Sequence, residues 1–184
     1  MLRRAPRSVS QLARWVLMLT TLVSVTPGFT SGATPPAAAS SEVDPYVAAA
    51  RDAGVPLEVL IAVAGAESGY HPWALDIEGR QVFSKSRAEA ETVLANTTTT
   101  NVDIGLMQIN WRFWGPRLGV AKLDLLDPRI NLRMGARILR ESLDRNGSMW
   151  RRISNYHSGA RRERERYNQQ VYGAYMRYLR GQVR

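Results

Sequence analysis

Glu67 is the residue whose position most clearly suits acid chemistry. It lies at the C-terminal end of a helix predicted from Pro56, and almost all of the dozen residues before it are apolar. The negative end of the helix dipole and burial both disfavour a carboxylate, so the pKa of Glu67 should be raised. A carboxyl that holds its proton near neutral pH can protonate the leaving oxygen when a glycosidic bond breaks. The alternative is a glutamate that simply reaches solvent at a frayed helix end.

A second carboxylate would decide how such a bond is broken, because glycoside hydrolases normally use two. Asp76, Glu78 and Asp103 are nearest to the motifs in the sequence, but each also suits a turn or a helix cap. If Glu67 works alone, it must donate a proton and later take one, and a hydroxyl of the same sugar becomes the nucleophile. Such a hydroxyl already has a high effective concentration. Both mechanisms stay open at this point.

The segment GLMQIN at 105–110 has the composition of a sugar-binding site. It places the amides of Gln108 and Asn110 beside the apolar side chain of Met107. Sugars need hydrogen bonds to hydroxyl and N-acetyl groups together with flat apolar contact, so these three residues are candidate substrate contacts. Aromatic side chains follow directly, and each could stack on a sugar face or pack in the core: Trp111, Phe113 and Trp114.

The elements that must position these groups are mainly helices. Cap residues and prolines at helix starts, with glycines at several ends, predict helices over 44–53, 56–68, 86–96 and 128–146, another from 148, and a last one over 162–180. A short hairpin is predicted from Ala74 to Phe83 around the Glu78-Gly79 turn. The sequence therefore predicts a mostly helical α+β protein, a single helical domain with one small β-hairpin and a substrate cleft.

The N-terminal residues have the order of a secretory signal peptide. Arginines precede an apolar stretch, and small residues follow. We predict a signal peptide over 1–33, a flexible leader over 34–43 and the folded domain over 44–182, with cleavage after Ala33 or, as a second candidate, Ala39. A membrane anchor is the alternative, but the apolar stretch is short and diluted for a span. After removal of the signal, no stable membrane span is expected.

The amino-acid composition excludes some kinds of catalytic and metal site and favours one class of partner. The chain has no cysteine and two histidines, which excludes thiolate chemistry and makes a histidine-based metal site unexpected. The formal net charge of +9 favours an anionic polymer as partner, such as nucleic acid, a membrane surface or cell wall. No metal and no cofactor is predicted.

Three motifs in order carry a resemblance to a known family. They are AESGY at 66–70, GLMQIN at 105–110 and NYHSG at 155–159, with LLDPRINLRMGARIL at 125–139 between the last two. With these motifs the chain resembles the soluble lytic transglycosylases, which are lysozyme-like enzymes. The resemblance implies that Glu67 is the sole acid and base, that Ser68 is its neighbour in the site, that Gln108 contacts N-acetyl sugars and that Tyr156 orients Glu67.

The implied reaction cleaves the bond between N-acetylmuramic acid and N-acetylglucosamine in peptidoglycan without water, and leaves a 1,6-anhydro end. Such an enzyme would be a monomer in the periplasm or cell envelope. One departure from the family pattern is His157, which stands where asparagine usually follows the tyrosine. The stretches 72–90 and 102–115 are similar to specialised members found with conjugation and type IV secretion systems, so components of that machinery are possible partners.

Three alternatives remain from the sequence. A lysozyme-type muramidase would use the same Glu67 and deliver water with help from Asp103 or Asp76. A non-catalytic peptidoglycan-binding component of a secretion system would keep the groove without turnover. A nucleic-acid binder built on RRERERY at 161–167 is disfavoured, because Glu163 and Glu165 offset part of its charge and an export signal precedes it.

Overall fold

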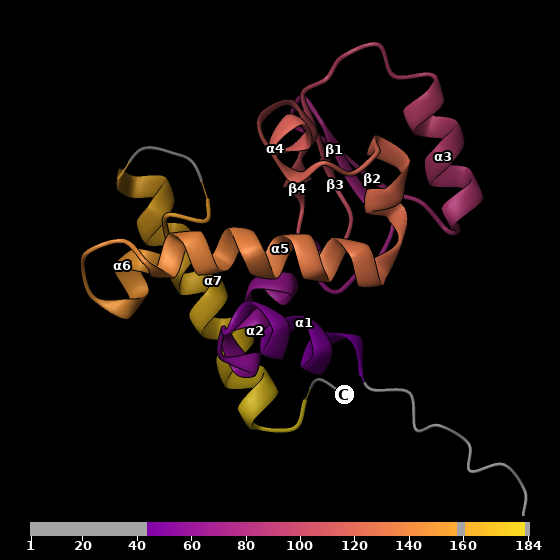
Figure 1. The fold of residues 1–184 in the computed structure, drawn as a ribbon. Helices are drawn as coiled ribbons and strands as arrows, with labels where there is room; N and C mark the ends of the chain where they lie inside the picture. Colours follow the sequence, from indigo (N-terminus) through magenta and orange to yellow (C-terminus); the bar gives the residue numbers. More distant parts are fainter. Residues whose placement is uncertain (1–43, 158–160, 183–184) are drawn as a thin grey trace, which may run out of the picture. The chain divides into compact units, whose positions relative to one another are not determined.

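Helices dominate the chain in the computed structural model, which describes residues 44–157 and 161–182 (Figure 1). The order is α1 Pro45–Ala53, α2 Leu57–Ser68, β1 Ala74–Ile77, β2 Arg80–Phe83, α3 Arg87–Ala95, β3 Val102–Ile104, β4 Ile109–Asn110, α4 Trp111–Leu118, the 3-10 helix η1 Lys122–Leu126, α5 Pro128–Leu143, α6 Met149–Ile153 and α7 Arg161–Leu179. This arrangement confirms the mostly helical α+β class. The proposed signal peptide and leader, 1–33 and 34–43, lie outside the described residues.

The predicted helix starts are confirmed by their cap contacts. The carboxylate of Asp44 accepts a hydrogen bond from the backbone nitrogen of Tyr46 at 2.7 Å, and Ser86 accepts one from that of Glu89 at 3.2 Å. Asp127 caps α5 in the same way. Each cap provides an acceptor for a backbone donor that the first helical turn leaves unpaired.

Helix α5 ends earlier than predicted, at Leu143 and not near Gly147. The guanidinium of Arg152 in α6 donates a hydrogen bond at 2.8 Å to the carbonyl of Leu143, one of the carbonyls that a helix end leaves unpaired. This contact from a later helix fixes the end of α5. Asn146 and Gly147, both poor helix formers, then lie in the connection to α6.

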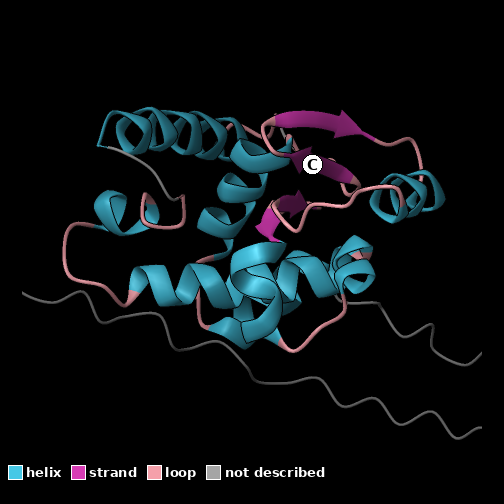
Figure 2. Cartoon of the chain, turned by 90° about the horizontal axis from the view of Figure 1, so that it is seen from above, coloured by secondary structure: helices cyan, strands magenta, loops and turns pink. Residues whose placement is uncertain are grey.

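The predicted hairpin is confirmed as β1 and β2, but it is part of a larger sheet. The strands form one antiparallel sheet in the order β2-β1-β3-β4, and they gather together in both views of the domain (Figure 1, Figure 2). The prediction of a single hairpin was therefore incomplete, because the sheet contains two further strands, β3 and β4. β3 has three residues and β4 two, too few for an alternating pattern to be visible in the sequence.

The sheet has one apolar face and one polar face. Alternate residues of β1 and β3, among them Leu75 and Ile104, are buried in the core. On the other face, a row of directly opposed residues crosses all four strands, which we call the polar row: Gln81, Asp76, Asp103 and Asn110. Side chains alternate between the faces of a strand, so the polar row lies on the side away from that core.

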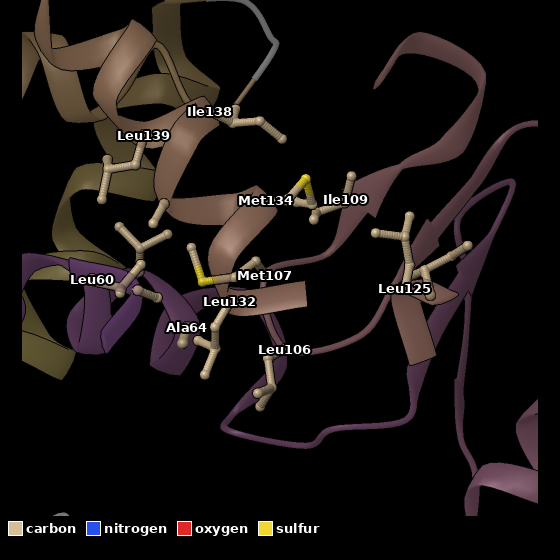
Figure 3. Close-up of a cluster of buried hydrophobic side chains, with 14 of the residues drawn as sticks. Leu60, Ala64, Leu106, Met107, Ile109, Leu125, Leu132, Met134, Ile138 and Leu139 are labelled. Atoms are coloured by element: carbon tan, nitrogen blue, oxygen red, sulfur yellow. The ribbon is translucent and has the colours of Figure 1, made fainter. Parts of the chain in front are cut away.

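The core is centred on α2, as its apolar character on every side predicts. Leu60 and Ala64 of α2 are fully buried and lie near Met107 and Leu132, the latter in α5 (Figure 3). α2 also packs along α7, and α1 packs along α5. Within 44–157 and 161–182, no helix combines the length and the apolar character that a bilayer crossing requires.

Candidate active site

The end of α2 brings Glu67 to the edge of the core. Glu67 is the penultimate residue of the helix and is half-buried. The chain then turns sharply, because Gly69 and Tyr70 both have left-handed backbone conformations, with φ of 60° and 70°. Such a conformation is unusual for tyrosine and persists only where the surrounding structure enforces it. The turn separates Glu67 from the strand that follows.

The environment of Glu67 favours its protonated form. The pKa of Glu67 is raised from 4.5 to about 8, and burial is the largest cause. A hydrogen bond from the hydroxyl of Tyr167 to Oε1, at 2.8 Å, acts in the opposite direction, and the negative charge of Asp103 raises the pKa further. The pKa is thus raised as the sequence predicts. At neutral pH the carboxyl holds a proton that it can donate.

Tyr167 of α7 donates a hydrogen bond to Glu67, and the sequence did not indicate this partner. Its side chain is buried, and its ring stacks on that of His157 with a centroid distance of 4.9 Å and an interplanar angle of 12°. Tyr167 lies 100 residues after Glu67, directly after a run of arginine and glutamate. The only available signal was its place on the apolar side of the last predicted helix.

Replacing Tyr167 by phenylalanine should shift the pH dependence of catalysis upward. The hydrogen bond from Tyr167 stabilises the carboxylate, so its loss raises the pKa of Glu67 above that of the wild type. We also expect kcat to fall roughly tenfold, because the carboxylate is left without its donor. The measurement is the pH profile of kcat/KM on soluble peptidoglycan fragments. An unchanged alkaline midpoint would contradict this role.

Tyr156 was expected to orient Glu67, but its hydroxyl bonds to the backbone of Met107. Its hydroxyl donates a hydrogen bond at 2.8 Å to the carbonyl of Met107, whereas the direct hydrogen bond to Glu67 comes from Tyr167. Burial raises the pKa of Tyr156 well above its ordinary value, and the nearby charges of Glu67 and Asp103 add to this effect. Tyr156 therefore lies at the site and fixes the turn that follows β3.

Ser68 is buried, and its hydroxyl faces the protein. The hydroxyl donates to the carbonyl of Leu106 at 2.9 Å and to that of Ala64 at 3.2 Å. Its side chain links the end of α2 to the turn after β3, next to Glu67. The proton of this hydroxyl is used inside the fold, and a substrate contact by Ser68 stays a prediction.

Met107 belongs to the core. Its side chain has no exposed surface and lies directly against Gly135 of α5, where even a Cβ atom would collide with it (Figure 3). The expectation that Met107 contacts sugar is therefore corrected. Its backbone contributes instead, since its nitrogen donates to Oδ1 of Asn131 at 2.9 Å and its carbonyl accepts from Tyr156.

Gln108 retains a group that can reach substrate. Its Nε2 donates to the carbonyls of Ala74 at 3.1 Å and Gly105 at 2.9 Å, which fixes the orientation of the amide. The oxygen Oε1 takes no part in these bonds. Gln108 is half-buried and has a φ of 42°, a strained conformation for a residue with a side chain. Strain of this kind is common at binding sites.

Asn110 supports its neighbours. Its Nδ2 donates to Oδ1 of Asp103 at 2.7 Å and to Oδ1 of Asn101 at 3.0 Å, while its own Oδ1 accepts from the backbone of Phe113 at the start of α4. Both amide protons and the carbonyl oxygen are engaged. In the structure Asn110 holds Asp103, and a substrate contact by Asn110 stays a prediction.

Asp103 is the carboxylate that interacts with Glu67. Burial raises the pKa of Asp103, the hydrogen bond from Asn110 lowers it, the charge of Asp76 raises it and His157 lowers it. Asp76 lies directly opposite on β1 and accepts a hydrogen bond from Gly79 at 2.6 Å, which is the turn role expected for it. Of the carboxylates considered from the sequence, Asp103 is thus the one whose charge raises the pKa of Glu67.

A pocket of about 330 Å³ lies elsewhere in the domain. It is enclosed by the end of α1, α4 and α5, and residues such as Trp114, Arg117 and Arg140 form its wall. Neither Glu67 nor Gln108 lines it, so it is not the hollow in which the proposed acid would act.

The domain is helical with a small sheet, and a carboxyl of raised pKa lies at the end of its buried helix, an arrangement consistent with the lysozyme-like fold. The chain matches the family model of the transglycosylase SLT domain over residues 44–176 and belongs to that family. It is therefore a peptidoglycan lytic transglycosylase, which acts in the cell envelope. A search of curated proteins gives no match, and a search of solved structures gives none either.

Proposed function

We propose that this enzyme cleaves the bond between N-acetylmuramic acid and N-acetylglucosamine without water and leaves a 1,6-anhydro end. The observation that carries the proposal is the carboxyl of Glu67, whose pKa of about 8 keeps it protonated at neutral pH. Within the described residues it accepts a hydrogen bond from Tyr167, which can stabilise the carboxylate once the proton has left.

The proposed reaction regenerates the protonated carboxyl of Glu67 and balances without water. Glu67 protonates the glycosidic oxygen, the bond between C1 and this oxygen breaks, and positive charge develops at C1 of the muramic acid. The carboxylate of Glu67 then takes the proton of the C6 hydroxyl of the same sugar, whose oxygen bonds to C1. Glu67 is protonated again and no water is consumed. The C6 hydroxyl needs no recruitment from solvent, since it is part of the same ring.

Around Glu67 we propose distinct roles for the other residues. Tyr167 positions the carboxyl, and Tyr156 holds the turn after β3. The Oε1 atom of Gln108 accepts a hydrogen bond from a sugar hydroxyl or acetamido group, because the amide nitrogen is already engaged with two carbonyls.

A water-using muramidase reaction is a second candidate, and Asp103 favours it. Its charge acts on Glu67, and Asn110 holds one of its oxygens at 2.7 Å. In such a reaction Asp103 would stabilise the positive charge at C1 or orient the water, and the products would carry reducing ends.

Mass spectrometry of the soluble products separates the two reactions. We expect purified peptidoglycan to yield anhydro-muropeptides with the wild-type protein, and we expect the same products from the variant Asp103→Asn. Reducing, water-added products that disappear with Asp103→Asn would establish the muramidase instead. No release of soluble products by the wild type would contradict both reactions.

We further propose that the enzyme is exported by a signal peptide over 1–33, acts as a monomer and opens the wall locally for a conjugation or secretion apparatus. The support is the similarity of 72–90 and 102–115 to the specialised members of the family. Loss of the gene should lower substrate transfer by that apparatus, and the wild type but not Glu67→Gln should restore it. Restoration by both would contradict a role for wall cleavage.

A further inference from the structure

Phe83, the last residue of β2, has a large aromatic side chain that is not buried in the core. It is 54% exposed. In the strand it stands two residues after Gln81, so it lies on the same face of the sheet as the polar row. An exposed aromatic ring beside a row of hydrogen-bonding groups is the combination that carbohydrate recognition requires, because a sugar offers both C–H faces and hydroxyls.

Two other rings hold Phe83 in place. His71 meets it edge-on at a centroid distance of 5.4 Å and an angle of 67°, and Trp73 meets His71 edge-on at 6.4 Å and 78°. The orientation of His71 is itself fixed, since its Nδ1 accepts a hydrogen bond from the backbone of Trp73 at 3.3 Å. We call His71, Trp73 and Phe83 the aromatic shelf. Such a contact engages at most one face of the Phe83 ring, and the side chain remains 54% exposed.

The backbone connects the aromatic shelf to the catalytic residues. The nitrogen of His71 donates to the carbonyl of Ser68, the residue after Glu67, at 3.2 Å. Ala74 lies opposite Phe83 in the sheet, and its carbonyl accepts from the backbone nitrogen of Gly105 at 2.8 Å and from Nε2 of Gln108 at 3.1 Å. Phe83 therefore stands at the end of the sheet that adjoins both the end of α2 and Gln108.

The aromatic residues of α4 are less suited to stacking. The guanidinium of Arg117 lies over the ring of Phe113 at 4.4 Å and over that of Trp114 at 5.5 Å. A cation on one ring face leaves less of the ring for a sugar. In the described part of the chain, no arginine or lysine is found over Phe83.

On the basis of the proposed function, we propose that the aromatic shelf binds an N-acetylated sugar of the glycan strand, next to the sugars joined by the bond that Glu67 cleaves. The sugar lies on the face of Phe83, and Gln81 and Asp76 of the polar row accept or donate hydrogen bonds to its hydroxyl and acetamido groups. β2 is two strands away from β3, roughly 10 Å, so the shelf holds a different sugar from the one beside Asp103.

The variant Phe83→Ala tests this binding role. We expect KM for peptidoglycan to rise about fivefold to tenfold, with kcat within about twofold of the wild type, because the shelf binds the strand without touching the reacting atoms. Phe83→Trp should restore KM, since it again offers a flat ring. Little loss of stability is expected from a side chain that is half exposed.

Tyr172 of α7 provides a matched control. It is 51% exposed and also meets another ring edge-on, that of Trp150 at 5.4 Å. Tyr172→Ala should leave KM unchanged. An unchanged KM for Phe83→Ala, or an equal rise for Tyr172→Ala, would overturn the shelf while leaving the proposed reaction intact.

A binding experiment tests the shelf independently of the reaction. Calorimetric titration of Glu67→Gln with chitotetraose, the tetramer of N-acetylglucosamine, should show binding that weakens about fivefold to tenfold when Phe83→Ala is added. Equal affinity of the two variants, or binding by neither, would overturn the shelf. If the wild type yields no anhydro products, the proposed function fails, but this titration still decides the shelf.

Discussion

Replacing Glu67 by glutamine is expected to lower kcat for peptidoglycan cleavage by about a thousandfold. Glutamine keeps the shape and can still accept the hydrogen bond from Tyr167, but it cannot donate a proton to the leaving oxygen or take one back. KM should change little. The measurement is the initial rate of release of soluble muropeptides. Glu58→Gln, in the first turn of the same helix, is the matched control and should retain wild-type activity.

The same variant should be more stable than the wild type at neutral and alkaline pH. The pKa of Glu67 is about 8 in the folded protein and ordinarily 4.5, so the folded state binds the proton more tightly than the unfolded chain. The free energy of unfolding of the wild type therefore falls between these pH values, by about 1.4 kcal/mol per pH unit. Glutamine has no such dependence, so the difference in Tm should grow from pH 4.5 toward pH 8. A constant difference would contradict the raised pKa.

Replacing Asn131 by alanine is expected to cause the largest loss of stability, about 4 kcal/mol. Asn131 in α5 is fully buried. Its Nδ2 donates to the carbonyls of Ile104 and Leu125, both at 2.8 Å, and its Oδ1 accepts from the nitrogen of Met107 at 2.9 Å. Alanine would leave these three backbone groups without partners and create a cavity.

Thermal unfolding measures this effect, and we expect Tm to fall by roughly 10 °C. Ser142→Ala is the control in the same helix. Ser142 is also buried, but its hydroxyl donates a hydrogen bond to the carbonyl of Ile138, one turn earlier in the same helix. Its removal should lower the stability by less than about 1 kcal/mol. Equal losses for the two variants would show that the contacts of Asn131 do not hold the turn after β3.

Local signals in the sequence predicted most of the helices. Asp44, Ser86 and Asp127 cap the helices that they were expected to cap, and an apolar segment without a polar side became the buried α2. These features depend on neighbouring residues, which a sequence displays directly. The strands β3 and β4 were missed because pairing with β1, and not their own composition, defines them.

The site was predictable in its position but less so in its details. The raised pKa of Glu67 follows from an apolar helix, and the sequence contains that helix. Which side chains of 105–110 face inward depends on α5, which meets the turn from another part of the chain. Met107 therefore packs on Gly135, and Asn110 bonds to Asp103, although both residue types suit sugar contact. Tyr167 reaches Glu67 only through the packing of α7 on α2.

The packing of α7 on α2 also sets an order in which the surroundings of Glu67 can form during synthesis. The ribosome makes the chain from its N-terminus, so Glu67 emerges long before Tyr167, the residue 100 positions later that donates to it. Until α7 exists, the apolar surface of α2 lacks a neighbouring helix and the carboxyl lacks its partner. The carboxyl of Glu67 can therefore reach the surroundings that it has in the folded protein only after α7 has been made.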